Sequence, residues 1–216
     1  MKILFLVSFL FSSHALANEV AIQNNDPPQR HVKLFEHMNQ THIDFSINIQ
    51  NENINIPVSY FNQVGIGDKE WTKATVSHAA DLFVQWATER GFELSENGRR
   101  NIGLYVYDVH IDTLNNPDIM HYVNSLTEQN SGENNITGLY DAHSISGINV
   151  IFVAANNERS NRARAGTIAH ELAHFFCDYF RIYDNYFKTN SGTYNLEGPA
   201  YEFERYFMRT SNIKAK

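Results

Sequence analysis

The sequence predicts an α+β domain in which helices pack against a small mixed β-sheet. Short runs with an apolar residue at every second position are typical of strands with one buried face. Longer runs with apolar residues three or four positions apart are typical of helices with one buried face. The two patterns alternate along the 216 residues and end in two consecutive helical segments, which favours layers of helix and sheet around one core.

The first 17 residues are expected to be a secretory signal peptide, removed before the domain folds. Lys2 precedes an apolar run from Ile3 to Phe11, and Ala15-Leu16-Ala17 fits the small-residue pattern of a cleavage site. The apolar run is too short to remain as a membrane-spanning helix. We therefore expect cleavage after Ala17 and a secreted or periplasmic protein with no stable membrane anchor.

Residues 18–60 are predicted to form a polar tail followed by a β-hairpin. Residues 18–30 are polar and include two adjacent prolines. Apolar residues then alternate with polar ones over residues 41–50, and the alternation resumes after a short polar turn. Pro57 has no backbone N–H to donate, so we expect the second strand to lie at an edge of the sheet.

The remaining residues, 61–216, are predicted to form the main domain. Its first helix covers residues 71–90, where apolar residues form one stripe and Gly91 follows as a stop signal. The other segments are predicted in chain order as a strand at 102–107, a short helix at 117–126, a polar loop at 127–138, a strand at 147–154 and helices at 162–183 and 199–208.

The composition excludes several classes of partner and site. The chain has 17 Lys and Arg against 24 Asp and Glu, whereas nucleic-acid binders carry a basic surplus. Its one cysteine, Cys177, cannot form an internal disulfide and excludes a Cys-rich zinc module. Any bound metal must therefore be held by histidine and carboxylate, and Cys177 is expected to be a small buried residue.

The helix predicted at 162–183 contains His170-Glu171-Leu172-Ala173-His174. Histidines four residues apart lie on the same face of a helix, so both imidazoles can reach one metal ion. Glu171 is rotated by about 100° from His170, which places it beside the metal instead of in contact with it. This spacing is typical of a hydrolytic zinc site in which the glutamate takes a proton from a bound water.

A second motif, Asn195-Leu196-Glu197-Gly198-Pro199-Ala200, opens the last predicted helix. Together the two motifs resemble the gluzincin metallopeptidases, the clan that contains thermolysin-like enzymes, certain aminopeptidases and bacterial collagenases. The resemblance covers about residues 147–208. It implies a gluzincin-like catalytic core with one Zn²⁺ ion, held by His170, His174 and Glu197, and with Glu171 as general base and acid.

An alternative for the third ligand stays open. Gluzincins usually carry an acidic residue four positions after the ligand glutamate, where it orients the first histidine, but here that residue is Tyr201. Glu202 comes next, and a thermolysin-like alignment would make Glu202 the ligand instead. We favour Glu197 on the Glu-Gly-x-Ala match and expect Glu202 and Glu204 to lie on a solvated helix face.

The resemblance also implies residues that contact the substrate. Gluzincins have an edge strand before the metal helix that binds the substrate backbone, which makes candidates of Gly147, Ile148, Asn149 and Val150. The same strand signal is equally compatible with an internal strand. Candidate donors to the developing oxyanion are Tyr194, Tyr201, Tyr206 and His143.

These observations predict a secreted, monomeric zinc metallopeptidase, a hydrolase that cleaves peptide or protein substrates and has no nucleic-acid partner. Two alternatives remain open. One is a zinc-containing binding or inhibitory protein that cleaves nothing. The other is a structural secreted domain in which the His-Glu-Leu-Ala-His sequence is coincidental.

Overall fold

The computed structural model describes residues 40–49, 54–94, 103–110, 112, 137–143, 148–155, 160–187 and 196–213. The predicted signal peptide, polar tail and helix at 117–126 lie outside these residues, as does nearly all of the predicted loop at 127–138. Within them a five-stranded mixed sheet packs with helices, so the α+β prediction is confirmed. No helix in these ranges is long and apolar enough to span a membrane.

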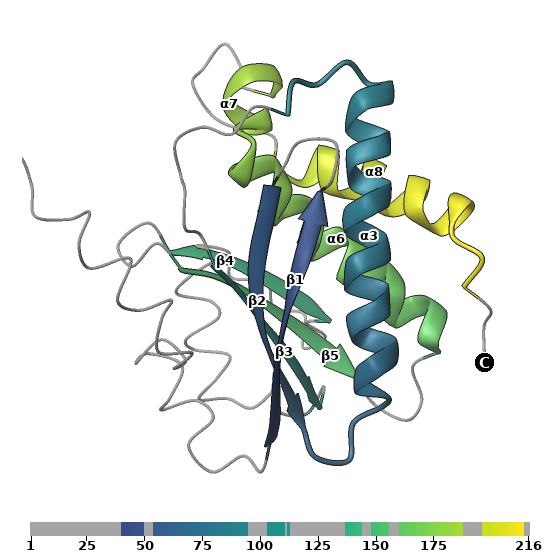
Figure 1. The fold of residues 1–216 in the computed structure, drawn as a ribbon. Helices are drawn as coiled ribbons and strands as arrows, with labels where there is room; N and C mark the ends of the chain where they lie inside the picture. Colours follow the sequence, from purple (N-terminus) through teal and green to yellow (C-terminus); the bar gives the residue numbers. More distant parts are fainter. Residues whose placement is uncertain are drawn as a thin grey trace, which may run out of the picture.

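The sheet has the strand order β1-β2-β3-β5-β4 (Figure 1). β1 (Gln40–Ile49) and β2 (Ile54–Gln63) form the predicted antiparallel hairpin. β3 (Gly103–His110) pairs in parallel with β2 on one side and with β5 (Ile148–Ala155) on the other. β4 (Gly138–His143) pairs antiparallel with β5 and forms the second edge of the sheet.

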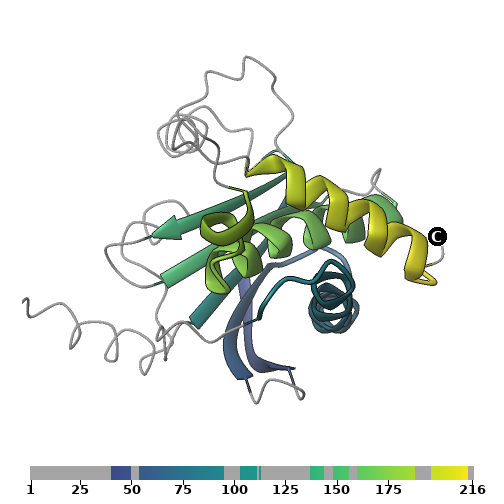
Figure 2. The same ribbon diagram turned by 90° about the horizontal axis from the view of Figure 1, so that it is seen from above.

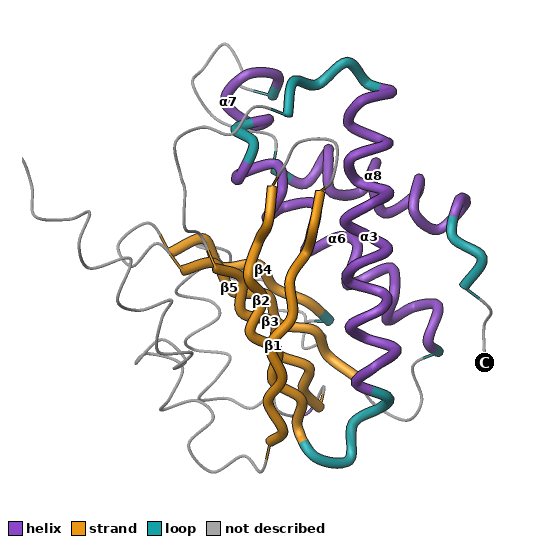
Figure 3. The backbone as a smooth tube through the Cα atoms, viewed as in Figure 1, coloured by secondary structure: helices purple, strands orange, loops and turns teal. Residues whose placement is uncertain are grey.

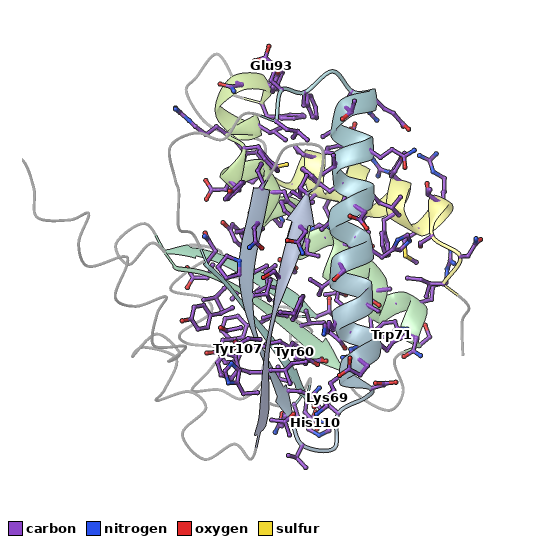
Figure 4. All side chains as sticks on the ribbon, in the orientation of Figure 1. Tyr60, Lys69, Trp71, Glu93, Tyr107 and His110 are labelled. Carbon is purple, nitrogen blue, oxygen red and sulfur yellow. The ribbon has the colours of Figure 1, made fainter. Side chains whose placement is uncertain are left out.

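The central strand β3 is buried on both of its faces. Leu104 and Val106 belong to the core shared with the helices. Tyr107, labelled in Figure 4, points to the other face and stacks between Phe61 and Phe152, with ring centroids 4.7 and 5.3 Å away. Burial on both faces explains why six of the eight residues of this strand are apolar or aromatic.

The helices gather on one side of the sheet (Figure 3). α3 (Lys69–Glu89) lies between β2 and β3 in the chain and packs against β1, whereas α6 (Asn161–Tyr179) packs against β4 and β5. After the short helix α7 (Ile182–Tyr186), α8 (Glu197–Thr210) runs alongside α6 (Figure 2). This pairing of α6 with α8 brings the two sequence motifs together.

Aromatic side chains join the three long helices. The ring of Phe83 in α3 lies 4.9 Å from that of Phe176 in α6 and 5.2 Å from that of Phe203 in α8, measured between centroids. All three side chains are fully buried. Burying each one stabilises the fold by about 1.5–3 kcal/mol, so the cluster fixes α6 and α8 relative to each other.

A buried ion pair attaches the first turn of α6 to the sheet. The fully buried carboxylate of Asp108 in β3 accepts hydrogen bonds from Arg164 of α6, from Thr72 at 3.1 Å and from Tyr60 at 2.9 Å. The ring of Trp71 lies 5.1 Å from the guanidinium carbon, and Figure 4 labels Tyr60 and Trp71 near the start of α3. Because breaking a buried pair leaves an uncompensated charge, these contacts favour one position of α6 on the sheet.

The hairpin is more fully integrated into the sheet than the sequence indicates. β2 is an internal strand, so the expectation of an edge is wrong. Pro57 is accommodated because pairing with β3 begins one residue later, at Val58. The division expected at residue 60 falls within β2, and the hairpin therefore belongs to the same sheet as the rest of the domain.

Two further elements differ from the sequence expectation. The helix predicted at 162–183 ends at Tyr179, because Arg181 adopts a left-handed conformation with φ 54°, and α7 follows as a separate helix. The strand β4 has no counterpart in the sequence prediction, since its six residues show no regular apolar alternation.

Candidate metal centre

α6 carries two histidines toward α8. The helix begins after Ser160, whose hydroxyl accepts a hydrogen bond from the Ala163 N–H, and most of its side chains are buried. His170 and His174 lie one turn apart on it. Their Nε2 atoms are 3.2 Å from each other, and their side chains are 13% and 11% exposed. The two rings therefore converge on one point at the margin of the core.

Glu197, the first residue of α8, brings a carboxylate to the same point. Its Oε2 lies 3.3 Å from His170 Nε2, and its Oε1 lies 3.6 Å from His174 Nε2. The three ligand atoms lie within 4.8 Å of one another, so His170, His174 and Glu197 form a group that could hold a metal ion. The Glu197 side chain is 59% exposed, which leaves this group open to solvent on the side of α8.

The spacing of the two histidine nitrogens fits a tetrahedral ion. Ligand atoms about 2.0–2.1 Å from a tetrahedral metal lie about 3.3 Å from one another. The Nε2 atoms of His170 and His174 are 3.2 Å apart, close to that value, and they face different oxygens of the Glu197 carboxylate, at 3.3 Å (Oε2) and 3.6 Å (Oε1). The two imidazoles are thus already spaced for one small cation, and the Glu197 carboxylate lies beside both of them.

One face of α8 carries the residues that contact the metal helix. At about 100° per residue, Glu204 lies about 20° from Glu197 around the helix, and Tyr201 about 40°. Glu202 lies about 140° away, and its carboxylate pairs with Arg90 at the end of α3 at 3.0 Å. Glu202 does not reach the histidines, so the alternative that makes it the third ligand is wrong.

Glu204 contacts the first histidine on the side away from the ligand atoms. His170 Nδ1 lies 3.2 Å from Glu204 Oε2, and since a carboxylate only accepts, the Nδ1–H is the donor. Nε2, on the other side of the ring, faces the Glu197 carboxylate. Glu204 does not lie on a solvated face as expected. Its spacing of seven residues from Glu197, about two helical turns, is the sequence signal that identifies it.

The second histidine has a neighbour that the sequence analysis does not identify. His174 Nδ1 lies 2.7 Å from the hydroxyl of Tyr183, and this hydroxyl donates to the backbone carbonyl of Leu196 at 3.0 Å. Tyr183 is buried, and it follows the left-handed residue Arg181. Because the chain changes direction there, no helical spacing in the sequence predicts the contact.

Glu171 lies between α6 and the edge strand β4. It is buried, and the backbone N–H of Tyr140 donates to its carboxylate. Gly138 permits this close approach, since a Cβ there would lie 2.5 Å from Glu171 Oε1 and 2.6 Å from Thr167 Cγ2. Burial raises the pKa of Glu171 to about 8, against the opposing effect of the charge on His170. Glu171 can therefore exchange a proton near neutral pH.

In the metal-free site, His170 carries the positive charge and lies between the carboxylates of Glu197 and Glu204. Burial opposes the charge on His170, but hydrogen bonds with Glu197 and Glu204 outweigh it and raise the pKa of His170 to about 10. Burial, together with the charge on His170, lowers the pKa of His174 to about 4. The hydrogen bond with His170 lowers the pKa of Glu197. The cluster thus favours a cation at the position where the three ligand atoms meet.

Among the predicted oxyanion donors, Tyr201 lies at the site. Its ring packs edge-on against that of His170 with centroids 4.7 Å apart, and the residue is 51% exposed. Tyr206 points away and donates to Glu89 of α3, so its assignment is wrong. Tyr194 lies outside the described residues, as does the side chain of His143, the last residue of β4.

The strand expected to border the substrate is an internal one. β5 lies between β3 and β4, so Ile148, Asn149 and Val150 have paired strands on both sides, and Gly147 lies outside the described residues. The internal alternative is therefore the correct one. The edge of the sheet next to the metal helix is β4.

No protein-family model, curated protein or solved structure matches this chain. The resemblance to gluzincins therefore stays a prediction from the two sequence motifs, and the structure shows that His170, His174 and Glu197 form a group that could hold a metal ion. Function is accordingly inferred from the geometry of the site.

Proposed function

We propose that this protein is a secreted zinc metallopeptidase of the gluzincin type. The observation that carries the proposal is the convergence of His170, His174 and Glu197, with the two Nε2 atoms at a spacing that suits a tetrahedral ion and with Glu171 next to them in the helix. Three protein ligands leave one position of such an ion free, which is the arrangement of catalytic zinc sites, whereas structural sites are closed by four.

The donor set favours zinc. Two imidazoles and one carboxylate suit zinc, while magnesium and calcium prefer sites made of oxygen atoms. Cys177 lies three residues after His174 but is fully buried in the core, where burial raises the pKa of its thiol. This supports an open site without a fourth protein ligand, and it agrees with the predicted buried position of Cys177.

Each residue of the site has a role in the proposed hydrolysis. When bound, zinc polarises the substrate carbonyl and lowers the pKa of a coordinated water to about 7. Glu171 accepts the proton that the attacking water loses and delivers it to the leaving amine. Its contacts with the Tyr140 N–H and Gly138 hold the carboxylate in place for this transfer. Tyr201 is the candidate donor to the substrate oxygen, since it is exposed beside His170.

We also propose that the substrate backbone binds along β4 in extended form. In the described part of the sheet β4 is the edge strand next to α6, and main-chain pairing with an edge strand is a common mode of peptide recognition. The Tyr140 N–H of this strand donates a hydrogen bond to Glu171, so a peptide that binds along this edge lies next to the proposed general base.

The test is hydrolysis of a peptide library by the purified protein with zinc, compared with the Glu171→Gln variant. We expect the wild type to cleave peptides and the variant to keep its zinc while turnover falls by about 10²–10⁴-fold. Zinc binding by the wild type without cleavage of any peptide would instead support a zinc-containing binding or inhibitory protein. Failure to bind zinc would support the structural domain with a coincidental motif.

A further inference from the structure

We propose that Tyr183 fixes the ring proton of His174 on Nδ1 and thereby holds its Nε2 lone pair ready for the metal. The inference rests on the proposed zinc site but concerns a residue outside the two motifs. Tyr183 touches no ligand atom of the site. It acts through His174 and is a positioning residue.

A single hydroxyl proton determines which nitrogen of His174 is protonated. The Tyr183 hydroxyl lies 3.0 Å from the carbonyl oxygen of Leu196 and 2.7 Å from His174 Nδ1. A carbonyl oxygen can only accept a hydrogen bond, so the hydroxyl proton is directed to Leu196. The contact with His174 then needs its proton from the imidazole, which places that proton on Nδ1 and leaves Nε2 bare.

Nε2 is the atom that faces the other ligands. It lies 3.2 Å from His170 Nε2 and 3.6 Å from Glu197 Oε1, whereas Nδ1 faces Tyr183. A metal-ligating histidine generally donates its other ring N–H to a fixed acceptor, and loss of such an acceptor weakens metal binding by about 10–100-fold. The phenol oxygen of Tyr183 is that acceptor for His174, as the carboxylate of Glu204 is for His170.

The same hydroxyl connects the second and third ligands. Leu196 immediately precedes Glu197, the first residue of α8. The bridge from His174 through Tyr183 to the Leu196 carbonyl therefore ties the orientation of one ligand to the backbone position of another. This one side chain therefore contacts α6 at His174 and the start of α8 at Leu196.

The break between α6 and α7 makes the contact possible. In a continuous helix, Tyr183 would lie nine residues beyond His174, about 13 Å further along the axis and on the opposite face. Instead α6 ends at Tyr179 and Arg181 takes up a left-handed conformation. The chain then returns and places Tyr183 against His174, so the irregular connection has a function in the site.

The test uses Tyr183→Phe, which keeps the buried ring and removes only the hydroxyl. Tyr186→Phe is the matched control, since Tyr186 is in the same short helix and its hydroxyl accepts from the Glu93 N–H, away from the ligands. We expect competition with a zinc chelator to show zinc binding about 10–100-fold weaker in Tyr183→Phe and unchanged in Tyr186→Phe. Unchanged zinc affinity in Tyr183→Phe would overturn the proposal.

A second measurement needs no variant. In the metal-free wild type, ¹⁵N chemical shifts of the imidazole nitrogens report which one carries the proton. We expect His174 to be protonated on Nδ1, and a proton on Nε2 would overturn the proposal even if Tyr183→Phe failed to fold. A wild type that binds zinc but cleaves no peptide would refute only the peptidase. A wild type that binds no zinc would overturn both proposals.

Discussion

Gly138 and Glu171 touch across the interface between the edge strand β4 and the metal helix α6. The approach is so close that a Cβ on residue 138 would lie 2.5 Å from Glu171 Oε1, well inside the contact distance of two such atoms. The general base of the proposed reaction thus rests on the strand proposed to bind the substrate. The position of the general base and its contact with the proposed substrate strand both depend on residue 138 being a glycine.

Gly138→Ala is therefore expected to reduce turnover while leaving the metal in place. The added methyl group displaces the Glu171 carboxylate, and a displacement of about 1 Å at a reacting group can lower the rate on the order of 100-fold. Steady-state kinetics with a cleaved peptide measures the effect, and elemental analysis serves as the control for bound zinc. Full activity in this variant would show that Glu171 does not need its present position.

Replacement of Glu197 should weaken zinc binding, whereas the same change at Glu202 should not. Glu197 provides one of the three ligand atoms, while Glu202 pairs with Arg90 on the surface. We expect Glu197→Gln to lower zinc affinity by more than about 100-fold, the upper end of the effect for an indirect partner of a ligand. Chelator competition measures both variants. Equal affinities for Glu197→Gln and Glu202→Gln would remove Glu197 from the site.

Glu204 should strengthen zinc binding through its hydrogen bond with His170. Glu204→Ala leaves the His170 Nδ1–H without its acceptor, so zinc affinity should fall by about 10–100-fold. Glu204→Gln should lose less, because an amide oxygen still accepts the same hydrogen bond. The order of the two variants in a zinc titration is the diagnostic result, and a larger loss in Glu204→Gln would contradict this role.

Zinc binding should release protons and strengthen as the pH rises. The pKa of His170 is raised to about 10 in the metal-free protein, so near neutral pH the metal must displace a proton from this ring. The pKa of His174 is lowered to about 4, so this residue contributes no proton above neutral pH. We expect affinity to rise about tenfold per pH unit up to about pH 10.

Calorimetry in buffers of different ionisation enthalpy measures this release directly. At least one proton should leave per zinc ion bound near neutral pH, with additional release from Glu171, whose pKa is raised to about 8. A zinc affinity that does not change over this pH range would show that metal-free His170 carries no second proton for zinc to displace, contrary to its hydrogen bonds with Glu197 and Glu204.

The helical parts of the site follow from residue spacing alone. His170 and His174 are one turn apart, so their convergence is set once α6 forms. The match of Glu197 to a known motif predicts the third ligand. The two-turn spacing from Glu197 to Glu204 also indicates a second carboxylate on the same face, but our prediction placed Glu204 on a solvated face. These relationships depend only on residue spacing along a helix, which can be determined from the sequence.

The parts of the site that depend on chain reversals are not predictable in this way. Tyr183 reaches His174 only because Arg181 is left-handed, a conformation rare for a residue with a side chain. β4 is a short edge strand whose existence depends on pairing with β5, and no apolar pattern marks it. Pro57 lies in an internal strand because the register with β3 begins just after it, and register is a property of the assembled sheet.

The rings of Phe83, Phe176 and Phe203 hold α6 and α8 together by apolar contacts that do not involve a metal ion. Small zinc modules lose their structure when a chelator removes the metal. If this protein binds zinc as proposed, removal of the ion should leave the fold intact and zinc should bind again. Folding and metal binding would then be separable steps, and the chain could fold first and acquire its ion afterwards from its surroundings.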